Sequence, residues 1–347
     1  MQYVKSGDIT TDIGHAGGVA AVAFSPNGEH LASGGFDRRV CIWNVSDRRL
    51  IHTFHGASAA LSLAWDPTET GTLICGFEDG SIYAIHASPV RPSSADYLFY
   101  TAHHFPVEHL AIHDAQLASG AHEDVAIWER GSDGKVGRWK HQLDLESPPT
   151  NSNNDDRGVL VTSIHWTRLR KRQPLLLVTY IYHGYVFFKA GEWTRLRANP
   201  LNGLIGSASV TPDGARLIIS NVTSGFDIYE TETGESVGTL AHPVSGMFAV
   251  PVLYVHGGNA VIGGSTCGEV HVWDATALRV HQVLRHAGKT GGYLVSDSLY
   301  SHATESDRIL ALSAHYDVTR DRFLIATGRT DADADMSITI WCAEGGE

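Results

Sequence analysis

The chain has 347 residues, of which 43% are hydrophobic and 18% are charged. This composition excludes a disordered or fibrous protein, because such chains contain far fewer apolar residues or a simple repeat. With 26 Lys and Arg against 38 Asp and Glu, the formal net charge is -12. A field of that sign repels phosphate groups, so we expect no non-specific binding to nucleic acid.

The N-terminus has no apolar signal core, and no run of residues approaches the length of a membrane span. We therefore expect no membrane attachment and a location in the cytoplasm, with the nucleus as the alternative. The four cysteines lack the paired spacing of a zinc site or a disulfide framework. We interpret them as buried free thiols: Cys41, Cys75, Cys267 and Cys342.

Residues 14–54 form the first predicted unit, a sheet of four short strands. The apolar run 19–24 ends at a Pro-Asn-Gly turn, and further short runs follow at 31–36, 40–44 and 50–54. A small sheet of this kind cannot bury both of its apolar faces alone. The pattern therefore predicts that copies of it stack against one another.

This first unit resembles the WD40 repeat. His15 follows a glycine, and a Ser-Gly pair that begins at Ser33 precedes Asp37, which lies six residues before Trp43. The resemblance implies a buried chain of hydrogen bonds from Trp43 to Ser33, then to His15 and to Asp37. One missing partner in such a chain leaves a buried polar group unpaired, at a cost of about 1–3 kcal/mol.

Six further units follow, although the unit at 159–197 has diverged most. Seven units fit the chain, and the resemblance implies an all-β, seven-bladed propeller in which residues 1–347 form a single domain. The chain after Trp341 is too short to supply an outer strand. We therefore expect the N-terminal strand to complete the last blade and close the ring. The run 220–229 also looks like one in uncharacterised fungal WD40 proteins.

The later units differ from the first in their polar positions. In blade two Ile85 replaces the tryptophan, so we expect no hydrogen-bond chain there. In blade three, which begins at His103, the aspartate position falls on His122, Glu123 or Asp124, and these three alternatives stay open. Blade five has Tyr229 in the tryptophan position. Blade six has Cys267 where aspartate is expected, followed by the literal pair Trp273-Asp274.

Ser33, His15 and Asp37 are also the residue types of a hydrolytic triad. The resemblance places Ser33 in the interior against Trp43, with no oxyanion hole beside it, so we expect a structural role and no enzymatic activity.

Metal and phosphate motifs are incomplete. His109 and His113 lack a third ligand at zinc spacing, the acidic run 331–335 lacks the glycine of a calcium loop, and the Gly-Lys-Thr at 288–290 lacks the first glycine of a phosphate loop. We expect neither a metal nor a cofactor.

One basic run is expected in a connection on the bottom rim of the ring. A solvated loop is the preferred interpretation, and a patch for an anionic partner is the alternative. The run consists of Arg168, Arg170, Lys171 and Arg172.

We expect binding at the top face, where the long connections 146–158 and 287–307 and the turns between second and third strands lie. Aromatic rings beside carboxylates attract Arg and Lys, so this face suits a basic peptide. The alternative is that Phe36 and Tyr182 pack under the long loops. The candidate contact residues are Phe36, Glu78, His122, Tyr182, Thr266, Thr330, Asp331 and Asp333.

The sequence therefore predicts a non-catalytic scaffold for protein or peptide partners, either a monomer or part of a hetero-complex, that binds a protein or basic peptide segment at its top face. The alternative is a propeller that binds a small molecule, or acts as an enzyme, at the channel mouth, with His109, His113 or His122 in polar roles.

Overall fold

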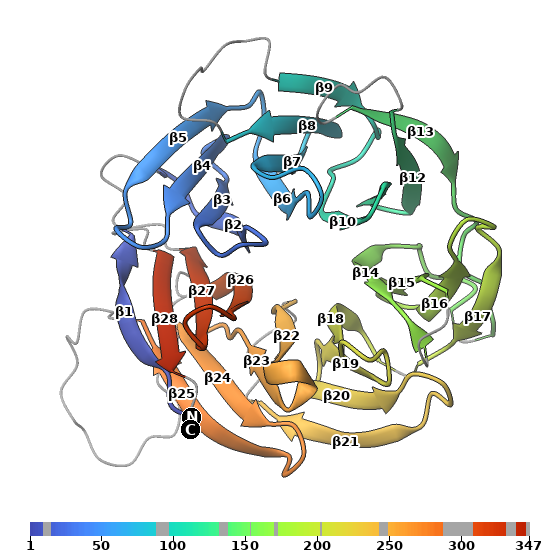
Figure 1. Cartoon of the computed structure of the whole chain (residues 1–347). Coiled ribbons are helices and arrows are strands. Elements are labelled where there is room, and N and C mark those ends of the chain that lie inside the picture. Colours follow the sequence, from blue (N-terminus) through green and yellow to red (C-terminus); the bar gives the residue numbers. More distant parts are fainter. Residues whose placement is uncertain are drawn as a thin grey trace.

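A computed structural model describes residues 1–9, 15–87, 97–131, 138–152, 154–169, 173–201, 203–242, 249–286, 308–330 and 338–344. Seven four-stranded antiparallel sheets stand as blades around a central axis (Figure 1). The predicted all-β, seven-bladed propeller is confirmed. None of the helices in these ranges is long and apolar enough to cross a bilayer.

In blades one to six the strands run in sequence order from the channel outwards (Figure 1). Blade one consists of β2 (Val19–Phe24), β3 (His30–Gly35), β4 (Arg39–Asn44) and β5 (Leu50–His55). Blade two consists of β6 (Ala60–Trp65), β7 (Thr72–Phe77), β8 (Ser81–His86) and β9 (Tyr97–Thr101). Blade three consists of β10 (His109–His113), β11 (Gln116–Ala121), β12 (Asp124–Arg130) and β13 (Trp139–Asp144).

Blade four consists of β14 (Val161–Thr167), β15 (Leu175–Tyr180), β16 (Gly184–Lys189) and β17 (Arg195–Asn199). Blade five consists of β18 (Ile205–Val210), β19 (Arg216–Asn221), β20 (Gly225–Glu230) and β21 (Ser236–Ala241). Blade six consists of β22 (Val252–Val255), β23 (Ala260–Gly263), β24 (Glu269–Asp274) and β25 (Arg279–Arg285). A short 3-10 helix, η3 (His256–Gly258), joins β22 to β23. Blade seven consists of β26 (Arg308–Asp317), β27 (Arg322–Thr330), β28 (Ile338–Glu344) and β1 (Val4–Ile9).

The N-terminal strand closes the ring, as predicted. β1 pairs antiparallel with β28 and forms the outer edge of blade seven, so the two ends of the chain meet in one sheet (Figure 1). The preceding residue, Tyr3, is held by blade six. Its N–H donates to Gln282 Oε1 at 2.8 Å, and Gln282 Nε2 donates to the Tyr3 carbonyl at 2.7 Å.

Apolar packing between neighbouring blades forms the core. Every residue of β7 and of β15 is buried, which places apolar side chains on both faces of these strands. In one cluster Ile42 and Phe54 of blade one pack with Leu73 and Phe77 of blade two. Burying one such side chain contributes about 1.5–3 kcal/mol, and here the burial depends on the adjacent blade.

Two expectations about individual residues are wrong. Cys41 and Cys75 are buried free thiols, but Cys267 is exposed in the turn after β23 and Cys342 is only half-buried on β28. The unit of blade four was expected to end at residue 197, but its outer strand begins at Arg195 and extends to Asn199. Trp193 has a left-handed backbone with φ of 55° in the preceding turn, which ends the strand pattern there.

The polar chain of blade one links four side chains. Trp43 Nε1 donates to Ser33 Oγ at 2.8 Å, His15 Nε2 lies 2.8 Å from the same oxygen, and His15 Nδ1 lies 2.9 Å from Asp37 Oδ1. Burial alone would lower the pKa of His15, but its bonds to Asp37 and Cys41 outweigh burial and raise the pKa to about 9. Below this pH the protonated imidazole donates to the Asp37 carboxylate.

Blade three has a shorter version of this chain. Trp128 Nε1 donates to Ser119 Oγ at 2.9 Å, and that oxygen lies 2.8 Å from His103 Nε2. Burial lowers the pKa of His103, so its ring is neutral and accepts a hydrogen bond from the Ser119 hydroxyl. Of the three residues left open for the aspartate position, Asp124 is the one whose charge acts on His103.

Blade seven contains a chain that the sequence analysis missed. Trp341 Nε1 donates to Thr327 Oγ1 at 3.0 Å, and that oxygen lies 2.6 Å from His286 Nε2. His286 Nδ1 lies 3.2 Å from Thr339 Oγ1, whose hydroxyl donates to Asp8 Oδ1 at 2.8 Å. The carboxylate that ends this chain therefore comes from the closing strand β1.

Blade six lacks the chain despite its Trp-Asp pair. Trp273 is paired with Val261, and the residue two positions further along β23, where blade one has Ser33, is Gly263. With no hydroxyl there, Trp273 Nε1 has no hydrogen-bond partner in the described residues.

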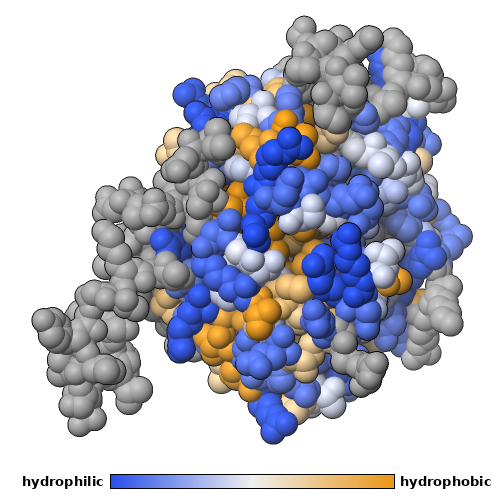
Figure 2. Space-filling view, turned by 60° about the vertical axis from the view of Figure 1, so that its left-hand side comes forward, coloured by the Kyte–Doolittle hydropathy of each residue, from blue (hydrophilic) through white to orange (hydrophobic). Residues whose placement is uncertain are grey.

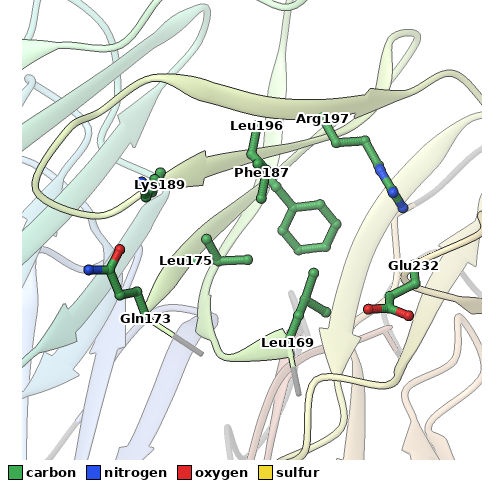
Figure 3. A pocket seen from close by; sticks show the side chains of 8 residues that line it. All are labelled: Leu169, Gln173, Leu175, Phe187, Lys189, Leu196, Arg197 and Glu232. Atoms are coloured by element: carbon green, nitrogen blue, oxygen red, sulfur yellow. The ribbon is translucent and has the colours of Figure 1, made fainter. Parts of the chain in front are cut away.

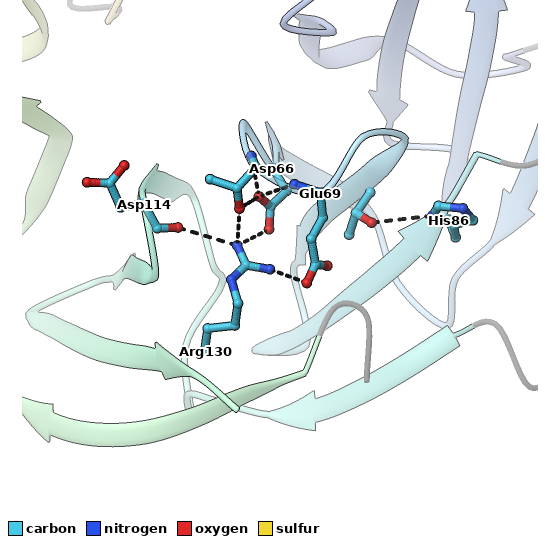
Figure 4. Close-up of polar contacts among 7 residues, drawn as sticks. Asp66, Glu69, His86, Asp114 and Arg130 are labelled. Atoms are coloured by element: carbon cyan, nitrogen blue, oxygen red, sulfur yellow. Dashed lines mark hydrogen bonds and ion pairs between the residues drawn. The ribbon is translucent and has the colours of Figure 1, made fainter. Parts of the chain in front are cut away.

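A buried ion pair joins blades two and three on the face opposite the β3–β4 turn (Figure 4). The Arg130 guanidinium lies 2.5 Å from Asp66 Oδ2 and 2.5 Å from a Glu69 oxygen, and it stacks 4.7 Å from the ring centre of Trp139. It also donates to the Asp114 carbonyl at 3.3 Å. The side chain of Asp66 is fully buried, so its charge depends on Arg130 for compensation.

The blade-one chain predicts a loss of stability at alkaline pH. A histidine whose folded-state pKa is raised stabilises the fold fully below its unfolded pKa of about 6.5, and this contribution disappears as pH rises through about 9. We expect Asp37→Asn to lower the free energy of unfolding by about 1–3 kcal/mol at pH 6.5 and by much less at pH 9.5, measured by urea unfolding. His103→Gln is the control, with no pH dependence in this window. If the free energies of unfolding of wild type and Asp37→Asn changed in parallel with pH, the raised pKa of His15 in the fold would be contradicted.

The ion pair between blades two and three predicts a large effect from one truncation. We expect Arg130→Ala to destabilise the protein by about 3–5 kcal/mol in urea unfolding, because it leaves the Asp66 carboxylate buried without a counter-charge. Arg216, whose pair with Glu230 at 3.8 Å is exposed, provides the control. Arg216→Ala should cost at most about 1 kcal/mol. Equal effects of the two substitutions would show that Asp66 is not compensated by Arg130.

Candidate functional site

The top face of the propeller carries the turns between the second and third strands of each blade. In blade one this turn presents Phe36, whose side chain is 51% exposed while its N–H donates to the Gly18 carbonyl at 2.9 Å. Figure 2 shows a largely hydrophilic surface on which hydrophobic residues emerge in separate patches. The backbone of Phe36 is thus fixed while its ring is open to solvent.

The matching turn of blade two presents carboxylates. Glu78 and Asp79 are both exposed, and the Glu78 N–H donates to the Ala59 carbonyl at 2.9 Å. Asp79 Oδ1 accepts from the Ser81 N–H at 3.1 Å and from its hydroxyl at 2.5 Å. Asp79 therefore shapes the turn, while Glu78 is left at the surface.

The matching turn of blade three contains an aromatic pair. His122 is exposed, and its ring stacks on Phe105 with centroids 4.6 Å apart and planes at 25°. Phe105 is 40% exposed and was not identified from the sequence. Phe105 lies in the connection between β9 and β10. Because connections of this kind lie on the top face, its position in the sequence could have identified it as a candidate contact residue.

The turn of blade four is covered. The Arg157 guanidinium lies 5.4 Å from the ring centre of Tyr182, and Asn154 Nδ2 donates to the Tyr182 carbonyl at 3.3 Å. Tyr182 is consequently only half-buried rather than exposed. The loop 146–158 packs over this aromatic, which is the arrangement given as the alternative for Tyr182, whereas Phe36 is open.

The turn of blade six is held by a serine. Ser265 Oγ accepts from the N–H of Cys267 at 3.2 Å and of Glu269 at 3.0 Å, so a hydroxyl does the work of a turn carboxylate. Thr266, between them, is half-buried and has its own contacts. In blade seven, Thr330 ends β27, and its side chain, Asp331 and Asp333 lie outside the described residues.

The central channel contains a cavity of about 330 Å³ lined by the inner strands of all seven blades. Its titratable groups come from blades three and four. Burial lowers the pKa of His109 and of His165 to about 4, so both rings are neutral, and desolvation by the channel wall raises the pKa of Glu108. His109 Nε2 donates to the Val161 carbonyl at 3.2 Å.

The other histidines singled out for polar roles do not converge on this cavity. His113 lies at the far end of β10, where it packs 5.3 Å from Trp166, and His122 stacks on Phe105. Within the described ranges, no group of three His, Cys, Asp or Glu side chains is arranged to hold a metal ion.

Comparisons with known proteins agree with the fold. A family model described as "WD domain, G-beta repeat" matches residues 7–44. The chain is 31% identical over 87 residues to a U3 small nucleolar RNA-associated protein 15 homolog of Gallus gallus, 32% over 73 residues to the ribosome biogenesis protein BOP1 of Mus musculus, and 38% over 72 residues to WD repeat-containing protein 1 of Bos taurus.

These matches are local. They cover 25%, 21% and 20% of this chain, and 16%, 10% and 12% of the three relatives. The ring of seven four-stranded blades is a β-propeller, and over residues 7–44 it is similar to the WD40 repeat.

Proposed function

We propose that this propeller is a non-catalytic scaffold that binds a basic segment of a partner protein at its top face, over blades one to three. WD40 propellers are typically non-catalytic scaffolds, and the WD-repeat relatives support a general role in protein interaction. Residues 1–347 act in this proposal as one domain, either as a monomer or within a hetero-complex.

The arrangement of exposed aromatics and acids carries the proposal. Phe36 on blade one and Phe105 on blade three are both substantially exposed, and Glu78 and Asp79 are exposed on the blade between them. Aromatic faces and carboxylates both attract Arg and Lys side chains. Exposed aromatics also contribute a large share of binding energy at protein interfaces.

The remaining candidates have smaller roles in this proposal. Tyr182 already carries Arg157 over its ring, so it has less surface to offer a partner. Thr266 and Thr330, together with Asp331 and Asp333, extend the proposed contact around the rim towards blades six and seven. The channel is not proposed as a catalytic site, because His109 is bonded to a backbone carbonyl and is neutral.

The names of two relatives bear on location. One is a U3 small nucleolar RNA-associated protein homolog and another is a ribosome biogenesis protein. These names support a nuclear location for this chain in addition to the cytoplasm.

The test is affinity capture with variants of the two exposed aromatics. We expect Phe36→Ala combined with Phe105→Ala to reduce recovery of captured partners about thirtyfold, since truncating a central aromatic typically costs 2 kcal/mol or more. Glu78→Lys should act in the same direction, because it repels a basic segment. Recovery would be measured by quantitative mass spectrometry against wild type.

Tyr182→Ala is the matched control, and it should retain capture because its ring is already covered. Thermal melting of every variant separates loss of binding from loss of folding. Retained partners in the double variant, or equal loss in Tyr182→Ala, would refute the proposed surface.

A further inference from the structure

Blade four is basic although the protein is acidic. Between Gly158 and Pro212 the sequence contains seven Lys and Arg residues and one acidic residue, Glu192, in a chain of net charge -12. Four of the seven lie in described parts of the structure: Arg168, Lys189, Arg195 and Arg197. This reversal of charge is local to one blade and its junction with blade five.

An apolar groove opens at that junction (Figure 3). Leu169 and Leu196 line it at the surface, the buried side chains of Leu175 and Phe187 lie beneath, and its volume is about 660 Å³. This volume lies within the range of known ligand-binding clefts. Leu196 is 56% exposed, so the apolar wall is accessible from solvent.

The groove continues past these side chains along the blade junction. A second hollow of about 440 Å³ shares Arg197 and Glu232 with the first and extends to Pro200 and Gly234 in the neighbouring turn. The two adjoining hollows together are large enough for several residues of an extended peptide rather than for a single side chain.

Positive charge stands at the rim of the groove. Figure 3 shows Lys189 on one side of the groove, and Arg197 of β17 on the other side, where Glu232 also lies. Lys189 is paired with Glu192 at 2.5 Å, and Arg195, which points elsewhere, is paired with Glu146 at 3.2 Å. Across the described ranges, Arg197 makes no ion pair, so its guanidinium is available to an incoming carboxylate.

We propose that this groove is a second interaction surface, which binds an acidic peptide segment of a partner protein. A bulky apolar side chain of the segment packs on Leu169 and Leu196, and an adjacent Asp or Glu accepts two hydrogen bonds from the planar guanidinium of Arg197. The site lies between blades four and five and does not use the aromatics of blades one to three.

The lining favours a peptide over other anions. A nucleic acid would require several phosphate contacts, and it offers no aliphatic group for a floor of leucine and phenylalanine. A membrane surface is flat, whereas these apolar side chains line a recess. A short segment with one apolar anchor and neighbouring carboxylates matches both the recess and its rim.

The experiment is a selection from a phage library of random peptides about twelve residues long. The full-length protein is the target, and a parallel selection uses the double variant Leu196→Ser with Arg197→Glu. We expect wild type alone to enrich peptides in which a bulky apolar residue adjoins Asp or Glu. Labelled synthetic copies should bind Leu196→Ser and Arg197→Glu each at least tenfold more weakly, measured by fluorescence anisotropy.

Controls separate this site from other effects. Arg49→Glu makes the same charge change at a 76% exposed side chain of blade one and should leave affinity unchanged. Phe36→Ala should also leave it unchanged, so failure of the top-face proposal and failure of this one are distinguishable. Thermal melting checks that each variant is folded.

Three outcomes would overturn the proposal. The first is no enrichment of acidic, apolar peptides above an uncoated surface, and the second is equal binding by wild type and the Arg197→Glu variant. The third is binding of a labelled single-stranded oligonucleotide or of phosphatidylserine vesicles that requires Arg197 but not Leu196. That result would identify a simple anion patch in place of a peptide groove.

Discussion

A four-stranded sheet with apolar side chains on both faces has to be covered from both sides. In this protein each blade covers its neighbours, as Ile42 and Phe54 do for Leu73 and Phe77, and a ring is the arrangement that leaves no blade uncovered. The rigid ring fixes every turn at one end of a packed strand. The top-face aromatics and the groove beside blade four are both placed by this constraint, and Leu175 and Phe187 beneath the groove belong to the apolar core between blades four and five.

The sequence predicted the number of blades and the closing strand because short apolar runs and turn residues recur at regular spacing. The polar chain of blade one was implied by the resemblance of its four side chains to the WD40 repeat. The sequence analysis missed the chain of blade seven, where Thr327 replaces serine and the carboxylate of Asp8 comes from the other end of the sequence. Blade six has the Trp273-Asp274 pair, but a tryptophan in this position joins a polar chain only when a hydroxyl faces it, and Gly263 has none.

The candidate surfaces were less predictable because exposure depends on residues from elsewhere in the chain. Phe36 and Tyr182 occupy equivalent turns, yet only Tyr182 has an arginine from the preceding loop over its ring. The exposure of Phe105 likewise depends on its stacking with His122. The basic character of blade four is visible in the sequence, but the groove requires Glu232 of the next blade and therefore appears only once two blades are placed together.

The pairing of β1 with β28 joins two strands that lie more than 300 residues apart in the sequence. Until β28 leaves the ribosome, β1 has no partner strand, and exposed strand edges are sites of aggregation and of pairing with other chains. The earlier blades can form one after another during synthesis. The ring itself closes only when β26, β27 and β28 are present and β1 has paired with β28. A nascent chain of this protein therefore passes through an open-ended form whose protection by chaperones would matter more than the stability of any one blade.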